Sequence, residues 1–204
     1  MSLVGRAARR GSWLALACAL APAAIPAPTA PDTTSDSRGL DALLQQFAAR
    51  RASHVTFTEV HQLALLDRPL QSSGELLYQA PDRLEKRTLK PRAETLVLEH
   101  GVLSAQRGRH TYQMALRDYP QVVPFIESIR ATLAGDRATL ERLFHVDFDG
   151  TVDNWTLHLV PSDETLAGVV TDIRIAGTRD AIRTVEIREH NGDRSLLTLG
   201  AVSP

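Results

Sequence analysis

The chain has 204 residues, with 23 Lys and Arg against 24 Asp and Glu, a formal net charge of −1 and a single cysteine. A balance this close to neutral argues against a nucleic-acid partner, because nucleic-acid-binding domains present a basic face. One cysteine excludes an intrachain disulfide, so a packed core has to stabilise the fold.

Residues 1–30 have the pattern of a secretory signal peptide. Three arginines precede an apolar run from Trp13 to Ala21, and a stretch rich in Pro and Ala follows. A charged segment, a short apolar segment and small residues in this order direct export, and the run is too short to span a bilayer. We therefore expect residues 1–30 to be removed and residues 31–38 to be a flexible leader. The exported chain then carries 20 basic against 24 acidic residues.

Cys18 lies inside the apolar run and leaves two alternatives open. A lipoprotein signal would place a lipidated cysteine after a longer apolar run, usually with Leu three residues before it, but that position is Ala15. We favour removal of Cys18 with the signal peptide. The remaining body of roughly 170 residues has the size of a single domain.

The first half of this body changes from helical to strand periodicity. The segment from Leu40 to Phe47 places its apolar residues on one face of a helix. Alternation of apolar and polar residues then predicts strands separated by turns, of which His100–Gly101 is one. The strands are expected at residues 53–66, 74–79, 83–89, 95–99, 102–105 and 110–116.

The second half begins with another amphipathic helix. It is predicted at residues 122–134, because Phe125, Ile126, Ile129 and Leu133 share one face. The chain then returns to strands, expected at residues 144–148, 154–160, 168–176, 181–188 and 194–199, with hairpin turns at 149–150 and 191–193.

About ten short antiparallel strands with a few helices predict a mainly β (α+β) domain built on one large curved antiparallel sheet. Helices are expected to cover its concave face. Two alternatives remain open for the apolar concave side. Helices that fill it make a packed core, and helices that only cap it leave a cleft for an apolar ligand.

No residue pattern in the chain indicates catalysis or a metal site. The seven histidines stand alone among strand residues, without Cys, His or Glu at metal-ligand spacing. Residues 147–150 begin like a calcium loop but lack its later ligands, and Ser72–Gly74 lacks the strand–elbow–helix setting of a hydrolase nucleophile. Asp82, Glu85 and Glu99 are interpreted as the solvated face of strands. We predict no catalytic residue, no metal ligand and no cofactor, and therefore no enzyme.

Several segments, taken together in order and spacing, resemble one known family. They are VTFTE (55–59), GELLYQAPDR (74–83), Pro91, LVLEHG (96–101), LAGD (133–136), FHVDFDG (144–150), WTLHLVP (155–161) and IRTVEIREHNGD (182–193). This succession, from about Leu40 to Leu199, is similar to the periplasmic outer-membrane lipoprotein carrier family (LolA-like). The resemblance implies one domain at residues 39–204, in which an unclosed half-barrel and a helical lid enclose an apolar cavity for acyl chains.

The function implied by this resemblance is that of a periplasmic carrier. It would shield the acyl chains of a lipoprotein or another exported lipid and deliver the cargo toward the outer membrane. Its partners would be this cargo, an inner-membrane donor and an outer-membrane acceptor, and the protein would be a monomer. The alternative is a non-carrier envelope regulatory or binding module of the same fold, like the sigma-factor regulators.

The sequence departs from the best-known carriers at the lid. Those proteins have an Arg that latches the lid, just before the Pro of the turn after the second strand, and this chain has Ala80 before Pro81. Either another arginine such as Arg83 substitutes, or apolar contact from the second helix closes the lid. We favour the apolar contact. A lipid other than a lipoprotein stays open as cargo.

Alternation also predicts which side chains face the concave side, because residues of one parity share one face of a sheet. The predicted lipid-binding residues are Val55, Phe57, Leu76, Tyr78, Leu96, Leu98, Tyr112, Met114, Trp155, Leu157, Ile173, Ile175, Val185 and Ile187 on strands, and Phe125, Ile126 and Ile129 on the lid.

Overall fold

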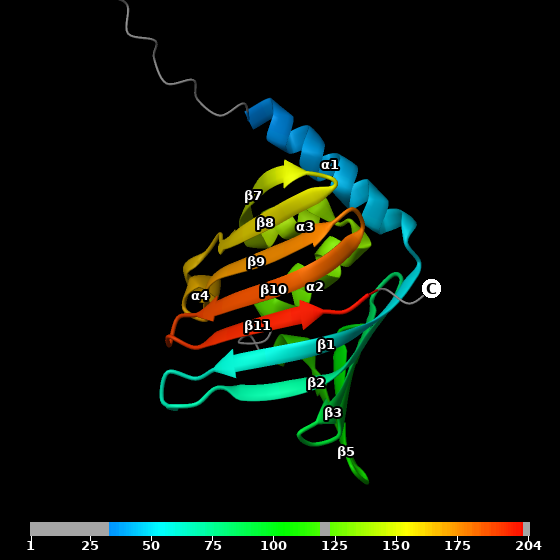
Figure 1. Cartoon of the computed structure of the whole chain (residues 1–204), viewed down its shortest axis with the longest axis vertical. Helices are drawn as coiled ribbons and strands as arrows, with labels where there is room; N and C mark the ends of the chain where they lie inside the picture. The colour runs from blue at the N-terminus through cyan, green and yellow to red at the C-terminus, as the bar shows by residue number, and fades with distance from the viewer. Residues whose placement is uncertain (1–32, 119–122, 202–204) are drawn as a thin grey trace, which may run out of the picture. The chain divides into compact units, whose positions relative to one another are not determined.

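The computed structural model describes residues 33–118 and 123–201 and is dominated by strands (Figure 1). The predicted signal peptide, Cys18 and Val122 lie outside the described residues. The strands are β1 (Ala52–Gln62), β2 (Leu70–Gln79), β3 (Arg83–Lys90), β4 (Glu94–Glu99), β5 (Val102–Arg107), β6 (His110–Ala115), β7 (Phe144–Thr151), β8 (Asn154–Pro161), β9 (Val170–Thr178), β10 (Ala181–Glu189) and β11 (Arg194–Leu199). The helices are α1 (Thr33–Ala49), the 3-10 helix η1 (Leu116–Asp118), α2 (Val123–Ala134), α3 (Arg137–Leu143) and α4 (Glu164–Ala167).

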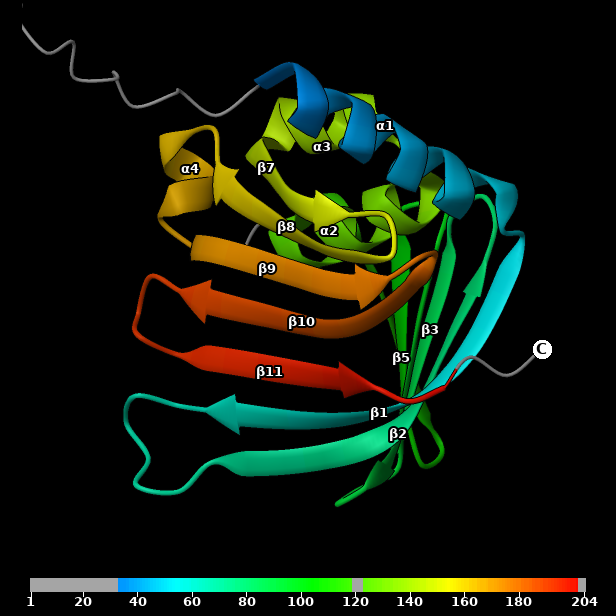
Figure 2. The same ribbon diagram turned by 45° about the horizontal axis from the view of Figure 1, so that its top comes forward.

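All eleven described strands form a single antiparallel sheet, in the order β6-β5-β4-β3-β2-β1-β11-β10-β9-β8-β7. The first and last of the described strands, β1 and β11, pair in the middle, and β6 and β7 are the two edges. The sheet curls so that β3 and β5 run steeply across the direction of β9–β11, with α2 and α3 on the concave side (Figure 2). The predicted unclosed half-barrel with helices on its concave face is confirmed.

The strand register confirms the predicted alternation. Val55 lies opposite Leu76, and the ladders continue from there through Lys86, Leu96 and Ala105 to Tyr112 at the β6 edge. In the other direction the same face runs through β11, β10 and β9 to β8. The strand residues predicted to face inward therefore all lie on one face of the sheet.

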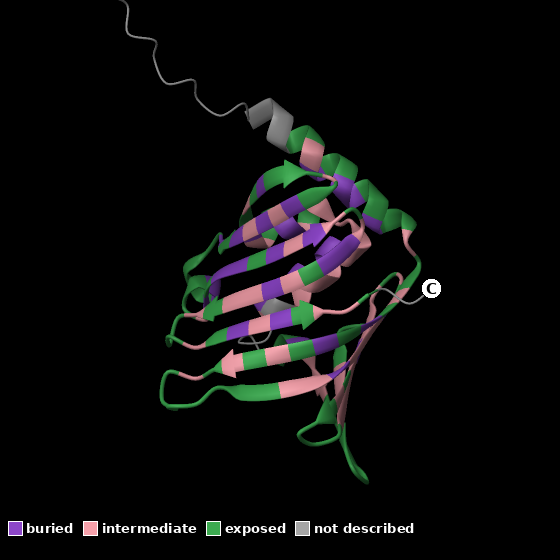
Figure 3. Cartoon of the chain, in the orientation of Figure 1, coloured by how far each residue is buried: buried purple, intermediate pink, exposed green. Residues whose placement is uncertain are grey.

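Helices fill only one half of this concave face. Leu43 and Phe47 of α1 are fully buried, as are Leu157 of β8 and Ile173 and Ile175 of β9, and all belong to one apolar core. Buried residues recur along β8–β10 and on α1 (Figure 3). Each large apolar side chain that leaves water contributes roughly 1.5–3 kcal/mol, so this half holds the stabilising core.

The junction between α2 and α3 is built by two adjacent residues. Gly135 follows α2 with a φ of 67°, a left-handed conformation that glycine adopts without strain. Asp136 then caps α3, because its Oδ1 accepts a hydrogen bond from the Thr139 N–H at 3.0 Å. A hydrogen bond with the Thr139 side chain is the main reason that the pKa of Asp136 lies below its ordinary value, and this backbone bond lowers it further.

Four local features differ from the sequence-based expectations. Helix α1 already begins at Thr33, so residues 33–38, expected as a flexible leader, are helical. Strand β1 ends at Gln62, not at residue 66, and the loop after it is fastened to Asp193 by the Ala64 N–H. The turn after β7 is at residues 152–153, because Thr151 still pairs with Asn154. Helix α4 was not predicted. Among the described helices, none has the length and apolar character needed to cross a membrane.

Candidate functional site

The half of the concave face that lacks core helices encloses a cavity of ≈ 410 Å³. This volume falls within the roughly 300–1,000 Å³ typical of small-molecule sites. Most of the wall is apolar, and it is formed mainly by β1–β4, β10, β11 and α2. The apolar lining consists of Val55, Leu76, Leu77, Tyr78, Leu84, Leu96, Leu98, Leu103, Ile126, Ile129, Leu133, Ala181, Ile182, Val185, Ile187, Leu197 and Leu199.

Helix α2 presents two different faces. Ser128, Ala131 and Thr132 are fully buried, and these small side chains form its packed face. Ile126, Ile129 and Leu133 are only partly buried and line the cavity. Their spacing of three and four residues places them on one helical stripe. Helix α2 is therefore a wall of the cavity and not a plug.

The expected lid contacts can be compared with this arrangement. Ile126 and Ile129 line the cavity, and the side chain of Phe125 lies outside the described residues. Arg83, the alternative latch, forms ion pairs with Glu85 and Glu99 at 3.0 and 2.9 Å, both on the sheet. These bonds hold Arg83 on the strands.

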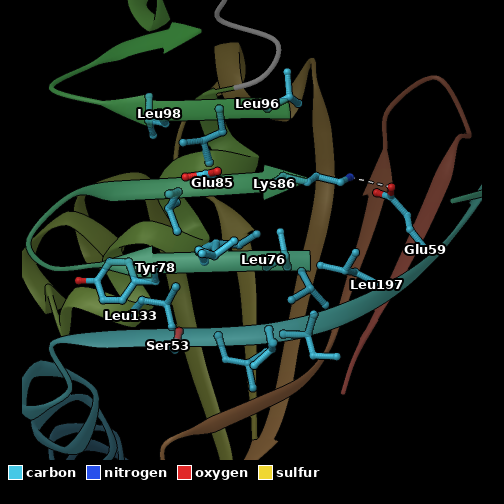
Figure 4. A pocket seen from close by; sticks show the side chains of 18 of the residues that line it. Ser53, Glu59, Leu76, Tyr78, Glu85, Lys86, Leu96, Leu98, Leu133 and Leu197 are labelled. Carbon is cyan, nitrogen blue, oxygen red and sulfur yellow. Dashed lines mark hydrogen bonds and ion pairs between the residues drawn. The ribbon is translucent and has the colours of Figure 1, made fainter. Parts of the chain in front are cut away.

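An ion pair lies in the wall of the cavity (Figure 4). Lys86 of β3 extends across β2 to Glu59 of β1, with 2.7 Å between Nζ and Oε2. The hydroxyls of Ser72 and Ser195 also donate to the Glu59 carboxylate, at 2.9 and 3.2 Å. Burial raises the pKa of Glu59, but Lys86 and the two hydroxyls outweigh it and hold this pKa below its ordinary value. The Glu59 carboxylate is therefore ionised at neutral pH.

Further polar and ionisable residues line both ends of the cavity. His61 and Glu189 lie near Ser195 and Glu59, at what we call the polar end of the cavity. The ion pair between Arg50 and Asp180 lies at the other end of the cavity, where β1 and β10 begin. The cavity thus has an apolar middle between polar groups, which suits an elongated amphiphile.

A family model described as outer membrane lipoprotein carrier protein LolA-like matches residues 32–203. The chain belongs to this LolA-like family. A comparison with curated proteins finds no match to it.

Three solved structures are similar to this LolA-like chain at low identity. A LolA superfamily protein from Nitrosomonas europaea is 10% identical with a TM-score of 0.43, over 82% of this chain and 92% of that one. LprF from Mycobacterium bovis is 12% identical with a TM-score of 0.39, over 84% and 95%. A chain of the Pseudomonas aeruginosa MucA/MucB complex is 14% identical with a TM-score of 0.43, over 82% and 58%. The family assignment rests on the family model.

About half of the predicted wall residues of this LolA-like protein line the cavity. They are Val55, Leu76, Tyr78, Leu96, Leu98, Ile126, Ile129, Val185 and Ile187.

The other predicted strand residues do not line the cavity, and this corrects the sequence-based wall. Phe57, Trp155, Leu157, Ile173 and Ile175 face the concave side but are buried in the core, where Phe47 packs edge-on against Trp155 with 5.7 Å between ring centroids. Tyr112 and Met114 lie on the β6 edge, and Tyr112 is 56% exposed. The alternation of residues along a strand predicts which face of the sheet a side chain is on. It does not predict which part of that face the helices cover.

Some lining residues were missed. Leu197 and Leu199 share the inward parity of β11, and Leu133 continues the α2 stripe, so the same reasoning could have found them. Glu59 and Lys86 could not be paired from sequence, because only the register of β1, β2 and β3 brings them together.

Proposed function

We propose that this protein is a periplasmic carrier that shields the acyl chains of a lipoprotein or another exported lipid and delivers it toward the outer membrane. The observation that carries the proposal is the cavity of ≈ 410 Å³ with an apolar middle, in a member of the LolA-like family. Residues 1–30, with their signal-peptide pattern, support export. The partners are the cargo, an inner-membrane donor and an outer-membrane acceptor.

The energetics favour a site of this kind. Each methylene exposed to water costs about 0.8 kcal/mol, so an acyl chain crosses an aqueous compartment only if most of it is covered. The leucines of β2–β5 and β11 cover one side of such a chain, and the α2 stripe covers the other. Delivery also requires release. Release requires Ile126, Ile129 and Leu133 to separate from the acyl chain, and these residues lie on a different face of α2 from its fully buried small residues.

Replacing Ile129 with Glu tests where the cargo binds. The variant places a charge in the apolar wall, so we expect uptake of a fluorescent long-chain fatty acid to fall at least about tenfold, as the burial of a charge without a partner is strongly unfavourable. Val160→Glu is the matched control, because Val160 is 39% exposed on β8 and lies outside the cavity wall. Equal uptake by both variants would show that the acyl chain binds elsewhere.

Delivery is tested with two vesicle populations, one carrying a labelled acyl lipid. A carrier accelerates transfer to the acceptor vesicles in proportion to its concentration, and Ile129→Glu slows that transfer. Mass spectrometry of the purified protein should in addition find bound lipid. An empty protein that neither takes up fatty acid nor accelerates transfer would favour the alternative, a regulatory or binding module of the same fold.

A further inference from the structure

Three potential metal ligands converge at the polar end of the cavity. His61 is the penultimate residue of β1, Glu189 ends β10, and Asp193 lies in the turn to β11. One donor atom from each lies within 4.8 Å of the others. His61 is distant in sequence from Glu189 and Asp193, which flank one turn, and it meets them because β1 pairs with β11, with His61 opposite Ser195.

The His61 imidazole has an unsatisfied nitrogen. Its Nε2 is buried and has no hydrogen-bond partner among the described residues. The nearest carboxylate oxygen, Oε1 of Glu189, is 4.0 Å away, which is too far for a hydrogen bond. Buried polar atoms without a protein partner are rare, and a position that binds an ion is one of the situations that accounts for them.

The Asp193 carboxylate is positioned by its surroundings. Oδ1 of Asp193 accepts the Ala64 N–H at 2.8 Å, and Oδ2 accepts the Asn191 side-chain amide at 3.0 Å. Such outer contacts orient ligands in metal sites. A carboxylate oxygen of Glu189 lies within 4.8 Å of one of Asp193, so the two negative charges repel each other, and a cation between them would offset that cost.

We propose that His61, Glu189 and Asp193 bind a divalent transition-metal cation, with Zn²⁺ as the best fit. One imidazole nitrogen and two carboxylate oxygens form a three-ligand zinc set, whose fourth position is open to water or a ligand. Zinc bonds of about 2.0–2.2 Å require the donors to draw together, and these partly exposed side chains can rotate to do so. Calcium and magnesium fit less well, because they prefer six or more oxygens.

The site has a defined relation to the cavity. His61 and Glu189 both line it, next to Ser195, which donates to Glu59. The open metal position would therefore lie at the polar end. The cation would also join the end of β1 to the β10–β11 turn. The proposal does not depend on what the cavity carries.

The test uses tag-free protein stripped with a chelator and titrated calorimetrically with ZnCl₂, and separately with CaCl₂. We expect one Zn²⁺ per chain and no saturable binding of Ca²⁺. His61→Ala and Asp193→Asn should each weaken Zn²⁺ binding by at least about 100-fold, since loss of an outer contact alone costs 10- to 100-fold. His54→Ala is the control, because His54 pairs with Glu75 at 3.3 Å outside this cluster, and it should bind like the unmodified protein.

A crystal soaked in ZnCl₂ gives an independent readout. Anomalous scattering at the zinc edge should show one strong peak between His61 Nε2 and the two carboxylates. Circular dichroism shows whether the variants fold. If His61→Ala does not fold, the zinc affinity of Asp193→Asn tests the site. Undiminished zinc binding by a folded variant, a zinc peak elsewhere, or no binding at millimolar ZnCl₂ would each overturn the site.

Discussion

Replacing Lys86 with Met isolates the contribution of the ion pair in the cavity wall. Methionine keeps most of the apolar length of the side chain and removes the charge. It leaves the Glu59 carboxylate with the hydroxyls of Ser72 and Ser195 as its described hydrogen-bond donors. It also removes the ammonium that lies 4.9 Å from the centre of the Phe57 ring.

The burial of the Glu59 and Lys86 side chains sets how much stability the substitution costs. Removing one partner of a fully buried pair costs about 3–5 kcal/mol, and an exposed pair contributes about 0–1 kcal/mol. The Glu59 and Lys86 side chains are 22% and 29% exposed, so this pair lies between the two limits. We expect Lys86→Met to lower the free energy of unfolding by about 2 kcal/mol. The double variant Glu59→Gln/Lys86→Met leaves no uncompensated charge, so it should regain at least about 1 kcal/mol of this loss.

Urea unfolding at pH 7, followed by tryptophan fluorescence, measures these differences in unfolding free energy. The slope of that free energy against urea concentration has to be the same for all variants. A loss below about 0.5 kcal/mol for Lys86→Met would mean that the pair behaves like an exposed one. A double variant no more stable than the single variant would show that the cost comes from packing and not from the stranded carboxylate. Either result refutes the electrostatic reasoning.

Three further predictions concern the framework. Phe47→Ala, at a fully buried position against Trp155, should lower the free energy of unfolding by about 3–5 kcal/mol in urea titrations, and should leave fatty-acid affinity unchanged in the folded fraction. Asp136→Ala removes the cap of α3 and should cost about 1 kcal/mol at pH 7. The folded-state pKa of Asp136 is lowered, so the stabilisation from its charge is complete above the ordinary pKa of 3.8 and is lost as the pH falls through the lowered value. The urea midpoints of the unmodified protein and of Asp136→Ala should therefore converge in acid. Gly74→Ala would place a Cβ 1.9 Å from a backbone carbonyl oxygen of β3. Overpacking costs roughly 1–3 kcal/mol, and a thermal melt should show a loss of stability near the upper end of this range.

The sequence contains the information for the faces of the sheet. Alternation placed Val55 and Leu76 on one face with Ile175, and the ladders confirm it, because a slip of one residue would turn every side chain of a strand to the other side. The two amphipathic helices were also predictable, since each carries a stripe of apolar residues at helical spacing.

The extent of the cavity was not predictable in the same way. Trp155 and Leu98 have the same apolar, inward pattern, yet one packs under α1 and the other lines the cavity. The difference depends on which strands the helices cover, a contact between distant parts of the chain. The ligand cluster of His61, Glu189 and Asp193 escaped the spacing rules for the same reason, because only strand pairing brings His61 to the turn that carries Glu189 and Asp193.

The position of β1 beside β11 has a consequence for how the chain folds. Residues 52–115 supply one half of the sheet and residues 144–199 the other, and the β1–β11 ladder joins the halves. Ser195 and Glu59, which meet across this ladder, are 136 positions apart. Closing so long a loop is entropically costly and makes folding slow. Synthesis therefore has to reach the last strand before the sheet can be completed, and a chain that is still growing lacks the strand that joins its two halves.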